Sequence, residues 1–307
     1  MRTVKDIETR NAPSEAVLID LIRRQNMILR TKESRAFTPA CCGRLKIMLA
    51  GDTGIGKTRL IESFMRSAFS SSHSSLKKQT SDFPVICEIP SSTLPLDSTV
   101  MDPSGKCNNI TFVDTPGLGA FMDASSVIQP CLEYITNQFE KTNAFLNPNI
   151  EDHRLSEFFN NLGAGGGLGH VDVCLYCVLH RVKPVDIEFM RLLAAHVTLV
   201  PIILKSDTMS LESVFSLKKT FLHHLSRSNI PIYGFGLGEQ ELTRLAEFHV
   251  GGSVPFCVST VETTEDRDGW CLNEAELLWR SLLCNHLADL RRLGVERFLA
   301  WRTANKS

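Results

Sequence analysis

The sequence predicts an α/β fold with a mostly parallel sheet and helices on both of its faces. Short apolar runs rich in β-branched residues alternate along the chain with segments of helical periodicity. This alternation is typical of parallel strands joined by crossover helices. We expect strands at Leu45–Ala50, Ile110–Asp114, Val173–Val178, Thr198–Leu204 and Pro255–Val258. We expect helices at Thr58–Ser67, Gln129–Phe139, Pro184–Ala195, Leu211–Ser226 and Glu274–Leu293.

The composition is that of an ordinary globular chain and excludes several classes of protein. The 307 residues are 43% hydrophobic and 22% charged, with a formal net charge of −1. This balance gives no overall attraction to nucleic acid, so we expect no nucleic-acid partner. No apolar run approaches the roughly 18 residues of a membrane span. The segment Met1–Arg10 lacks the apolar core of a signal peptide.

Residues 1–40 are expected to form a polar, weakly helical extension ahead of the first strand. A short apolar helix face would consist of Val17, Leu18, Leu21 and Ile22. A basic cluster accompanies it, made of Arg23, Arg24, Arg30, Lys32 and Arg35. Two interpretations remain open, namely a solvated helix face or a contact with acidic membrane lipids or a partner protein.

The first strand leads into a glycine-rich loop of the form G-x-x-x-x-G-K-T. Its residues are Gly51, Asp52, Thr53, Gly54, Ile55, Gly56, Lys57 and Thr58. In such a loop, backbone N–H groups surround the β-phosphate of a nucleotide, and the following helix points its N-terminus at the same anion. We predict that Lys57 reaches the β- and γ-phosphates and that the Thr58 hydroxyl is a ligand of Mg²⁺. The chain is therefore expected to bind a nucleoside triphosphate.

A second motif, Asp114-Thr115-Pro116-Gly117, ends the strand that begins at Ile110. A carboxylate at the end of a neighbouring strand is suitably placed to hold a Mg²⁺-bound triphosphate, usually through a water. Gly117 lets its backbone N–H approach the γ-phosphate with no side chain in the way. We therefore predict that Asp114 contributes to a metal site and that Gly117 contacts the nucleotide.

A third motif, Lys205-Ser206-Asp207, follows the apolar strand that ends at Leu204. It occupies the N/T-K-x-D position of guanine-nucleotide proteins, with Leu204 in place of the usual polar first residue. The Asp207 carboxylate would accept hydrogen bonds from the ring N–H and the exocyclic amine of guanine, a donor pair that adenine lacks. Lys205 would lie along the base. The three motifs together predict a P-loop GTPase domain that binds GTP or GDP with Mg²⁺.

The residues that would hydrolyse GTP cannot be assigned from the sequence. Leu118, Gly119 and Ala120 follow Gly117 and include no Gln to orient a water. A switch-type Thr that binds Mg²⁺ must lie between Ser67 and Ile110. The candidates in that interval are Thr80, Thr93 and Thr99. We therefore expect slow or absent hydrolysis.

Two further segments have simpler explanations than a second site. The glycine-rich run Gly163–Gly169 has no Lys and is followed by a strand, so we interpret it as a flexible insertion. Cys174 and Cys177 form a C-x-x-C on a predicted strand, where side chains three apart face opposite sides. They cannot share one metal ion, and the scattered cysteines are interpreted as reduced thiols.

With these motifs in place, the chain resembles a septin, a filament-forming GTP-binding protein. Pro184–Met190 is similar to the septin segment P-L-D-I-E-F-M, and Val200–Thr208 is similar to V-P-V-I-A-K-A-D-T. Val173–Tyr176 resembles the C-C-L-Y strand, and Asn149–Arg154 resembles N-I-Q-D-N-R. The resemblance runs from about Leu45 to Leu293. It implies a septin-like GTP-binding domain over residues 41–293, between the extension 1–40 and a short C-terminal tail over residues 294–307.

The resemblance also implies partners and a location. Septins form oligomers or filaments with themselves and with other septins, in the cytoplasm at the cytoskeleton and in some cases at membranes. They use two interfaces, one across the nucleotide pocket and one through both termini. His180 and Thr208 match positions that serve the nucleotide interface. Asp186 and Glu188 are expected to cap and solvate their helix rather than to do chemistry.

The sequence departs from the septin pattern in places, and other functions remain open. Trp270 matches the Trp of the septin element R-x-Y-x-W-G, but the Tyr is missing and the Arg is out of register. The strand P-F-x-V-x-G has become Pro255–Thr260, without the Gly beside the base. These changes bear on the nucleotide interface and on filament order.

Two alternatives stand beside a septin-like function, because AIG1/Toc34-like GTPases share the forms G-x-T-G-x-G-K and D-T-P-G-L and because the signal for catalysis is weak. One is a discrete GTPase switch of the AIG1/Toc34-like type, and the other is a scaffold that holds GTP or GDP without hydrolysing it.

Overall fold

The computed structural model describes residues 44–67, 85–93, 109–146, 155, 169–259 and 273–305. These residues form a six-stranded sheet in the order β2-β3-β1-β4-β5-β6. The strands are β1 (Leu45–Gly51), β2 (Cys87–Ser91), β3 (Ile110–Asp114), β4 (Val173–Val178), β5 (Thr198–Leu204) and β6 (Phe256–Val258). Within this sheet every pairing is parallel except that of β2 with β3. The predicted α/β fold is confirmed.

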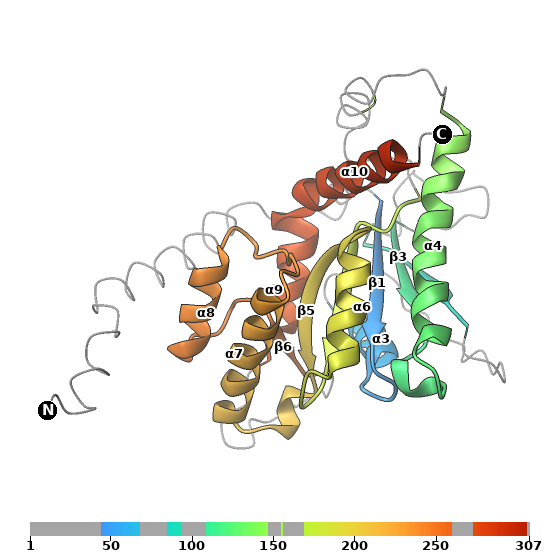
Figure 1. The fold of residues 1–307 in the computed structure, drawn as a ribbon. Coiled ribbons are helices and arrows are strands. Elements are labelled where there is room, and N and C mark those ends of the chain that lie inside the picture. Colours follow the sequence, from blue (N-terminus) through green and yellow to red (C-terminus); the bar gives the residue numbers. More distant parts are fainter. Residues whose placement is uncertain are drawn as a thin grey trace, which may run out of the picture.

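Helices cover both faces of the sheet (Figure 1). They are α3 (Lys57–Arg66), α4 (Ser125–Ala144), α6 (Pro184–Ala194), α7 (Leu211–Arg227), α8 (Glu239–Glu247), α9 (Ala275–Arg280) and α10 (Leu287–Ala304). Phe64 of α3 and Trp279 of α9 belong to the apolar cluster on one face. Phe139 of α4 and Phe189 of α6 belong to the cluster on the other face. In Figure 1, α4 and α6 lie in front of the sheet and α3 lies behind it.

Parallel pairing brings the ends of four strands to one edge of the sheet, which we call the carboxyl edge. Asp114, at the end of β3, pairs with Leu49 of β1. Gly51, at the end of β1, pairs with Cys177 of β4. β4 pairs in turn with β5, whose last residue is Leu204. Loops that leave these strands are therefore neighbours in space although they are far apart in the sequence.

β2 and α8 have no counterpart among the predicted elements. β2 is an edge strand of five residues that contains Pro90, and its side chains alternate between exposed and partly buried positions. Proline lacks the N–H that a central strand needs, so its presence weakens the sequence signal while an edge position tolerates it. α8 is a nine-residue helix, and the Glu241 carboxylate accepts a hydrogen bond from the Gly238 N–H at its start. A helix this short gives little periodicity to detect.

The helix predicted over Glu274–Leu293 is divided and extends further than expected. α9 continues through a π-helical segment, Ser281–Asn285, and α10 then runs to Ala304. Val295 and Phe298 of α10 are 8% and 0% exposed. The ring of Phe298 lies 5.7 Å from that of Phe139 in α4. Most of the expected tail, residues 294–304, is therefore helical, because its apolar side chains pack against α4.

The two cysteines of the C-x-x-C lie on opposite faces of β4, as the strand geometry requires. Cys174 belongs to one apolar cluster and Cys177 to the other, and both thiols are free. Burial raises the pKa of the Cys177 thiol to about 12, so this thiol is protonated at neutral pH. Neither cysteine is positioned for redox or metal chemistry.

Several predicted features lie outside the described residues. These are the extension 1–40 with its basic cluster, Asn149–Arg154, Gly163–Leu168 and Arg267–Trp270.

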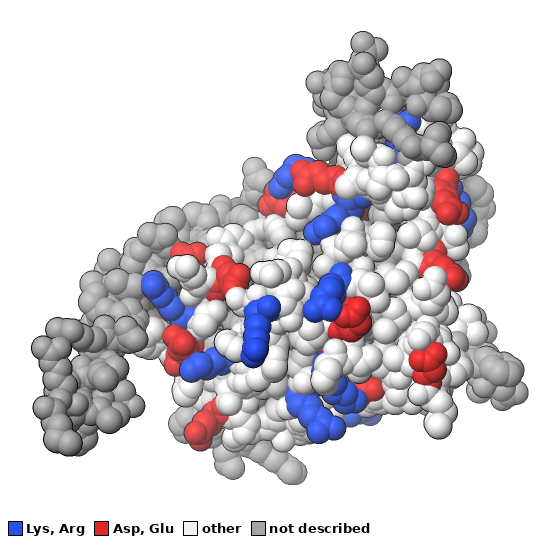
Figure 2. Space-filling view, in the orientation of Figure 1, with Lys and Arg blue, Asp and Glu red and all other residues white. Residues whose placement is uncertain are grey.

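Among the helices that the structure describes, none combines the length and the apolar character that crossing a membrane requires. Figure 2 shows basic and acidic side chains interspersed over the face that carries α4, α6 and α7.

A buried ion pair ties α7 to the residue that precedes α9. Lys218 Nζ lies 3.0 Å from Glu274 Oε2, and the two side chains are 0% and 5% exposed. Lys218 also donates to the Ser253 carbonyl at 3.1 Å. The Glu274 carboxylate accepts the N–H groups of Gly252 and Cys257. Because Cys257 lies in β6, this network fixes the edge strand β6 to the rest of the domain.

The network predicts that two neighbouring lysines of α7 differ sharply in their contribution to stability. Lys218→Met removes the cation but leaves the Glu274 carboxylate buried, so the free energy of unfolding should fall by about 3 kcal/mol. Lys219 is the matched control, since its side chain is 58% exposed and its contact with Glu247 is 3.8 Å long. Lys219→Met should change the value by less than about 0.5 kcal/mol. Urea denaturation measures both, and equal effects would contradict a stabilising role for the pair.

Candidate functional site

The glycine-rich loop connects β1 to α3 at the carboxyl edge, and its backbone geometry requires glycine. Gly51, Gly54 and Gly56 have φ angles of 134°, 69° and 110°, a region that residues with a Cβ rarely adopt. A Cβ on Gly51 would lie 2.1 Å from the carbonyl oxygen of Cys177 in β4. The loop therefore packs directly against the neighbouring strand, with its backbone and the start of α3 available to an anion.

Lys57 is held inside this loop by carbonyl groups of the loop itself. Its Nζ donates to the Asp52 carbonyl at 2.6 Å and to the Gly51 carbonyl at 3.3 Å. Burial lowers the pKa of the Lys57 ammonium, and the nearby acidic groups Asp114 and Asp52 offset part of this shift. The Ile55 side chain is 4% exposed and belongs to the core, so only its backbone could serve a nucleotide. The ammonium is thus held beside the N-terminus of α3, and its positive charge and that helix end both favour an anion.

Thr58 and Asp114 meet beside the loop. The Thr58 hydroxyl donates to Asp114 Oδ2 at 2.6 Å, although the two residues are 56 positions apart. Burial raises the pKa of the Asp114 carboxyl, while the hydrogen bond from Thr58 and the charge of Lys57 oppose this shift. A hydroxyl and a carboxylate are the oxygen donors that Mg²⁺ prefers, and Mg²⁺ commonly takes few protein ligands alongside phosphate oxygens. In the part of the chain described, no group of three or more His, Cys, Asp or Glu side chains could hold a metal. The Thr58 hydroxyl and the Asp114 carboxylate together fit a Mg²⁺ ion that also binds phosphate oxygens.

Gly117 lies against the phosphate loop. A Cβ on Gly117 would be 2.2 Å from both the N and the Cα of Thr53. Thr115, two residues before Gly117, is fixed to the sheet, because its hydroxyl donates to the Leu49 carbonyl at 2.7 Å. The segment from Asp114 to Gly117 therefore touches the loop where a terminal phosphate would bind, and only glycine allows so close an approach.

The third motif reaches the same loop from β5. Lys205 Nζ donates to the Gly54 carbonyl at 3.1 Å. Lys205 itself has φ 55°, and Thr208 closes the turn by donating its hydroxyl to the Lys205 carbonyl at 2.7 Å. Asp207 lies in the 3₁₀ turn Ser206–Thr208 with its side chain exposed. The structure thus places the residues predicted to bind phosphate, metal and base at one edge of the sheet.

The two residues predicted at an assembly interface are both exposed. His180 follows β4 by two positions, and Thr208 follows β5 by four. Because Val178 of β4 pairs with Ile203 of β5, both residues leave the sheet at the carboxyl edge. They lie on the same side of the domain as the phosphate loop.

Thr93 is not placed to be the switch-type threonine. Its N–H donates to Asn109 Oδ1 at 2.8 Å, and the Asn109 side chain donates back to the Thr93 hydroxyl at 2.7 Å. Asn109 precedes β3, whereas Asp114 ends it. At roughly 3.3 Å per residue, the length of the strand separates Thr93 from the metal residues by about 16 Å. The other candidates, Thr80 and Thr99, lie outside the described residues.

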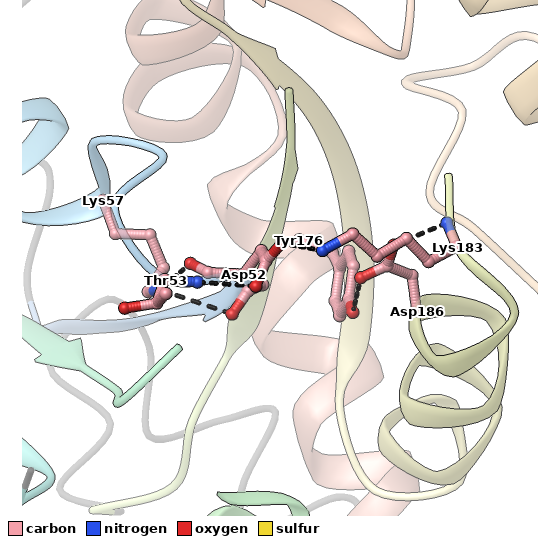
Figure 3. Close-up of polar contacts among 7 residues, drawn as sticks. Asp52, Thr53, Lys57, Tyr176, Lys183 and Asp186 are labelled. Carbon is pink, nitrogen blue, oxygen red and sulfur yellow. Dashed lines mark hydrogen bonds and ion pairs between the residues drawn. The ribbon is translucent and has the colours of Figure 1, made fainter. Parts of the chain in front are cut away.

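Lys183 is a site residue that sequence reasoning missed. Its ammonium forms an ion pair with Asp52 Oδ2 in the phosphate loop (Figure 3). The two residues are 131 positions apart in the sequence. Lys183 stands directly before Pro184, the first residue of α6, and no motif around it indicates a role in binding. Its only sequence signal is its place at the end of a loop that leaves the carboxyl edge.

Comparison with known proteins points to one family. The family model for septins matches residues 42–282. "Protein peanut" of Drosophila melanogaster is 26% identical over 318 residues, which cover 93% of this chain and 53% of that protein. Septin-9 of Homo sapiens is 29% identical over 217 residues, which cover 69% of this chain and 34% of that protein. The chain spans about half the length of the Drosophila relative and about a third of the human one.

A solved structure shares the fold. The crystal structure of a septin GTPase domain from Chlamydomonas reinhardtii matches with a TM-score of 0.54 and 18% sequence identity. The match covers 85% of this chain and 98% of that chain. At this identity the likeness shows a common α/β architecture.

The raised pKa of Asp114 predicts a pH-dependent cost to the stability of the nucleotide-free protein. Because the folded-state pKa lies above the unfolded one, stability falls as the pH rises through the range above about 4. Asp114→Asn removes this cost, so its free energy of unfolding should exceed that of the wild type at pH 7. The gain should disappear near pH 3, where the Asp114 carboxyl of the wild type is largely protonated in both the folded and the unfolded protein.

Urea unfolding at both pH values tests this expectation. Asp123→Asn, at an exposed position on the loop before α4, is the matched control. An Asp114→Asn variant that is less stable than the wild type at pH 7 would contradict the proposed cost.

Proposed function

The chain belongs to the septin family, and on that premise we propose that it binds GTP or GDP between Gly51–Thr58 and Lys205–Asp207. The observation that carries this proposal is the 3.1 Å hydrogen bond from Lys205 Nζ to the Gly54 carbonyl. It joins the predicted base-binding segment to the predicted phosphate loop across 151 residues. One nucleotide needs both parts within its own length, at the carboxyl ends of the strands.

Guanine selectivity would come from Asp207. Its exposed carboxylate can accept two hydrogen bonds from guanine, and adenine would leave it unpaired. The stem of Lys205 crosses the phosphate loop, with its Cε 3.8 Å from where a Cβ on Gly56 would lie. This position is suitable for a lysine stem that lies along the base. Thr58 would bind Mg²⁺ directly and Asp114 through a water, and the metal would supply neutralising charge to the phosphates.

We propose that hydrolysis is slow or absent. The Leu118 side chain is 7% exposed and belongs to the core. Gly119 and Ala120 carry no group that could orient a water. Thr93 is committed to Asn109 at the far end of β3. Without a positioned water, turnover in this class of site is slow, and the bound nucleotide would serve mainly as a structural element.

The bound nucleotide would shape an assembly surface at the carboxyl edge. His180 and Thr208 are exposed beside the nucleotide-binding segments, where a second copy of this chain or another septin could reach both. The proposed location is the cytoskeleton, in oligomers or filaments. Contact of the basic cluster Arg23–Arg35 with acidic lipids stays a prediction, because those residues lie outside the described part of the chain.

Base selectivity can be tested at Asp207. Asp207→Asn replaces an acceptor by a donor at one position, so affinity for GDP should fall roughly a hundredfold while affinity for xanthosine diphosphate rises. Isothermal titration calorimetry measures the affinity for each of the two nucleotides. Asp123→Asn, at another exposed aspartate, is the control. Unchanged preference for guanine would remove Asp207 from the base site.

Assembly can be tested at His180. Sedimentation velocity of the wild type with GTP or GDP should show oligomers, and His180→Ala should reduce their fraction several-fold because a partner contact is lost. His223→Ala, on the exposed side of α7, should leave the distribution unchanged. A strictly monomeric wild type with fast turnover would instead favour a discrete GTPase switch, and oligomers with no turnover would favour a scaffold.

A further inference from the structure

The phosphate loop contains a carboxylate, that of Asp52, close to where a nucleotide would place its own negative charge. Asp52 Oδ1 accepts a hydrogen bond from the Thr53 N–H at 2.9 Å, and Oδ2 pairs with the ammonium of Lys183. The Asp52 side chain is 22% exposed. Burial raises the pKa of Asp52, but Lys183 and the N–H groups of Thr53 and Gly119 together bring it below its usual value. The carboxylate is therefore charged, and one lysine outside the loop compensates that charge.

The backbone of Lys183 is fixed before its side chain reaches the loop. Lys183 is the N-cap of α6, and its N–H donates to Asp186 Oδ2 at 2.7 Å. The other Asp186 oxygen accepts the hydroxyl of Tyr176, a β4 residue, at 2.9 Å. Asp186 and Tyr176 are 2% and 0% exposed. Figure 3 shows this chain of contacts running from Tyr176 through Asp186 and Lys183 to Asp52. The ammonium is thus delivered from a buried support that belongs to the sheet.

Two lysines hold Asp52 from two directions. Lys57 Nζ donates to its main-chain carbonyl, while Lys183 pairs with its side chain. Lys57 is already the predicted phosphate contact, so it cannot by itself cancel both the Asp52 charge and that of the phosphates. Like charges a few ångströms apart in a partly buried site repel strongly. Without Lys183, the Asp52 carboxylate would therefore oppose the binding of an anion, and most strongly the anion with the most charge.

We propose that Lys183 is a positioning residue of the nucleotide site that neutralises Asp52 and so allows the loop to accept a triphosphate. The inference rests on the proposed binding of guanine nucleotide. It adds a residue from the start of α6 to that site and gives it a selective effect. Because the γ-phosphate carries additional negative charge, the contribution of Lys183 is larger for a triphosphate than for GDP.

A double-mutant cycle tests this proposal. The variants are Lys183→Met, Asp52→Asn and the double variant, with Lys219→Met as the matched control on exposed α7 surface. Methionine keeps the backbone N–H that caps α6, and circular dichroism checks that each variant folds. Calorimetry gives the affinity for GDP and for a non-hydrolysable GTP analogue, both with Mg²⁺. Lys183→Met should weaken binding of the analogue roughly tenfold and binding of GDP about threefold. Asp52→Asn in the same chain should restore both affinities to within about 1.5-fold of the wild type.

The outcomes separate this inference from the proposed function. If Lys183→Met binds both nucleotides as the wild type does, or if Asp52→Asn fails to rescue it, the role of Lys183 is overturned. The nucleotide site itself would still stand in that case, provided that Lys57→Ala abolishes binding. A wild-type chain that binds neither nucleotide overturns the proposed function and this inference together. A loss that is equal for GDP and the analogue contradicts the selective effect.

Discussion

Parallel pairing of β1 with both β3 and β4 is the constraint on which the site depends. Backbone hydrogen bonds place Asp114 beside Leu49 and Gly51 beside Cys177. The loop after β4 and the segment after β5 then leave the sheet at the same edge. A shift of β3 by one residue would turn Asp114 to the opposite face of the sheet, away from Thr58. The ladder, and not any side-chain contact, therefore decides which residues can cooperate.

The parts of this arrangement that could be predicted are those with a local signal. The buried strands are continuous apolar runs, and the three motifs follow their ends, so sequence order alone predicted one shared edge. Lys183 and the Lys218–Glu274 pair could not be predicted, because each depends on packing between elements 131 or 56 residues apart. The length of α10 was missed for a related reason. Phe298 is buried against Phe139 of α4, and the sequence of residues 294–307 does not by itself predict that contact.

Two sets of buried charges in this domain differ in how they are compensated. Glu274 has a cation and two backbone N–H groups, so the protein alone satisfies it. At the carboxyl edge, burial moves the pKa of Lys57 down and that of Asp114 up, so neither charge is fully compensated by its surroundings. The first arrangement is expected of a structural pair. The second is typical of a functional site, where groups are kept ready for a ligand at a cost in stability.

The segment that carries His180 links the proposed nucleotide site to the proposed assembly surface. Its N-terminal end is fixed by β4, where Val178 pairs with Ile203. Its C-terminal end is fixed at Lys183, which is bound to Asp186 and to Asp52 of the phosphate loop. A partner that contacts His180 therefore acts on a segment only a few residues long, with one end on the phosphate loop. If such a partner orders this segment, it increases the affinity for the nucleotide. Thermodynamic linkage then requires the nucleotide to increase the affinity for the partner by the same factor. Coupling of this kind needs no long pathway through the core, because the two sites share one edge of the sheet.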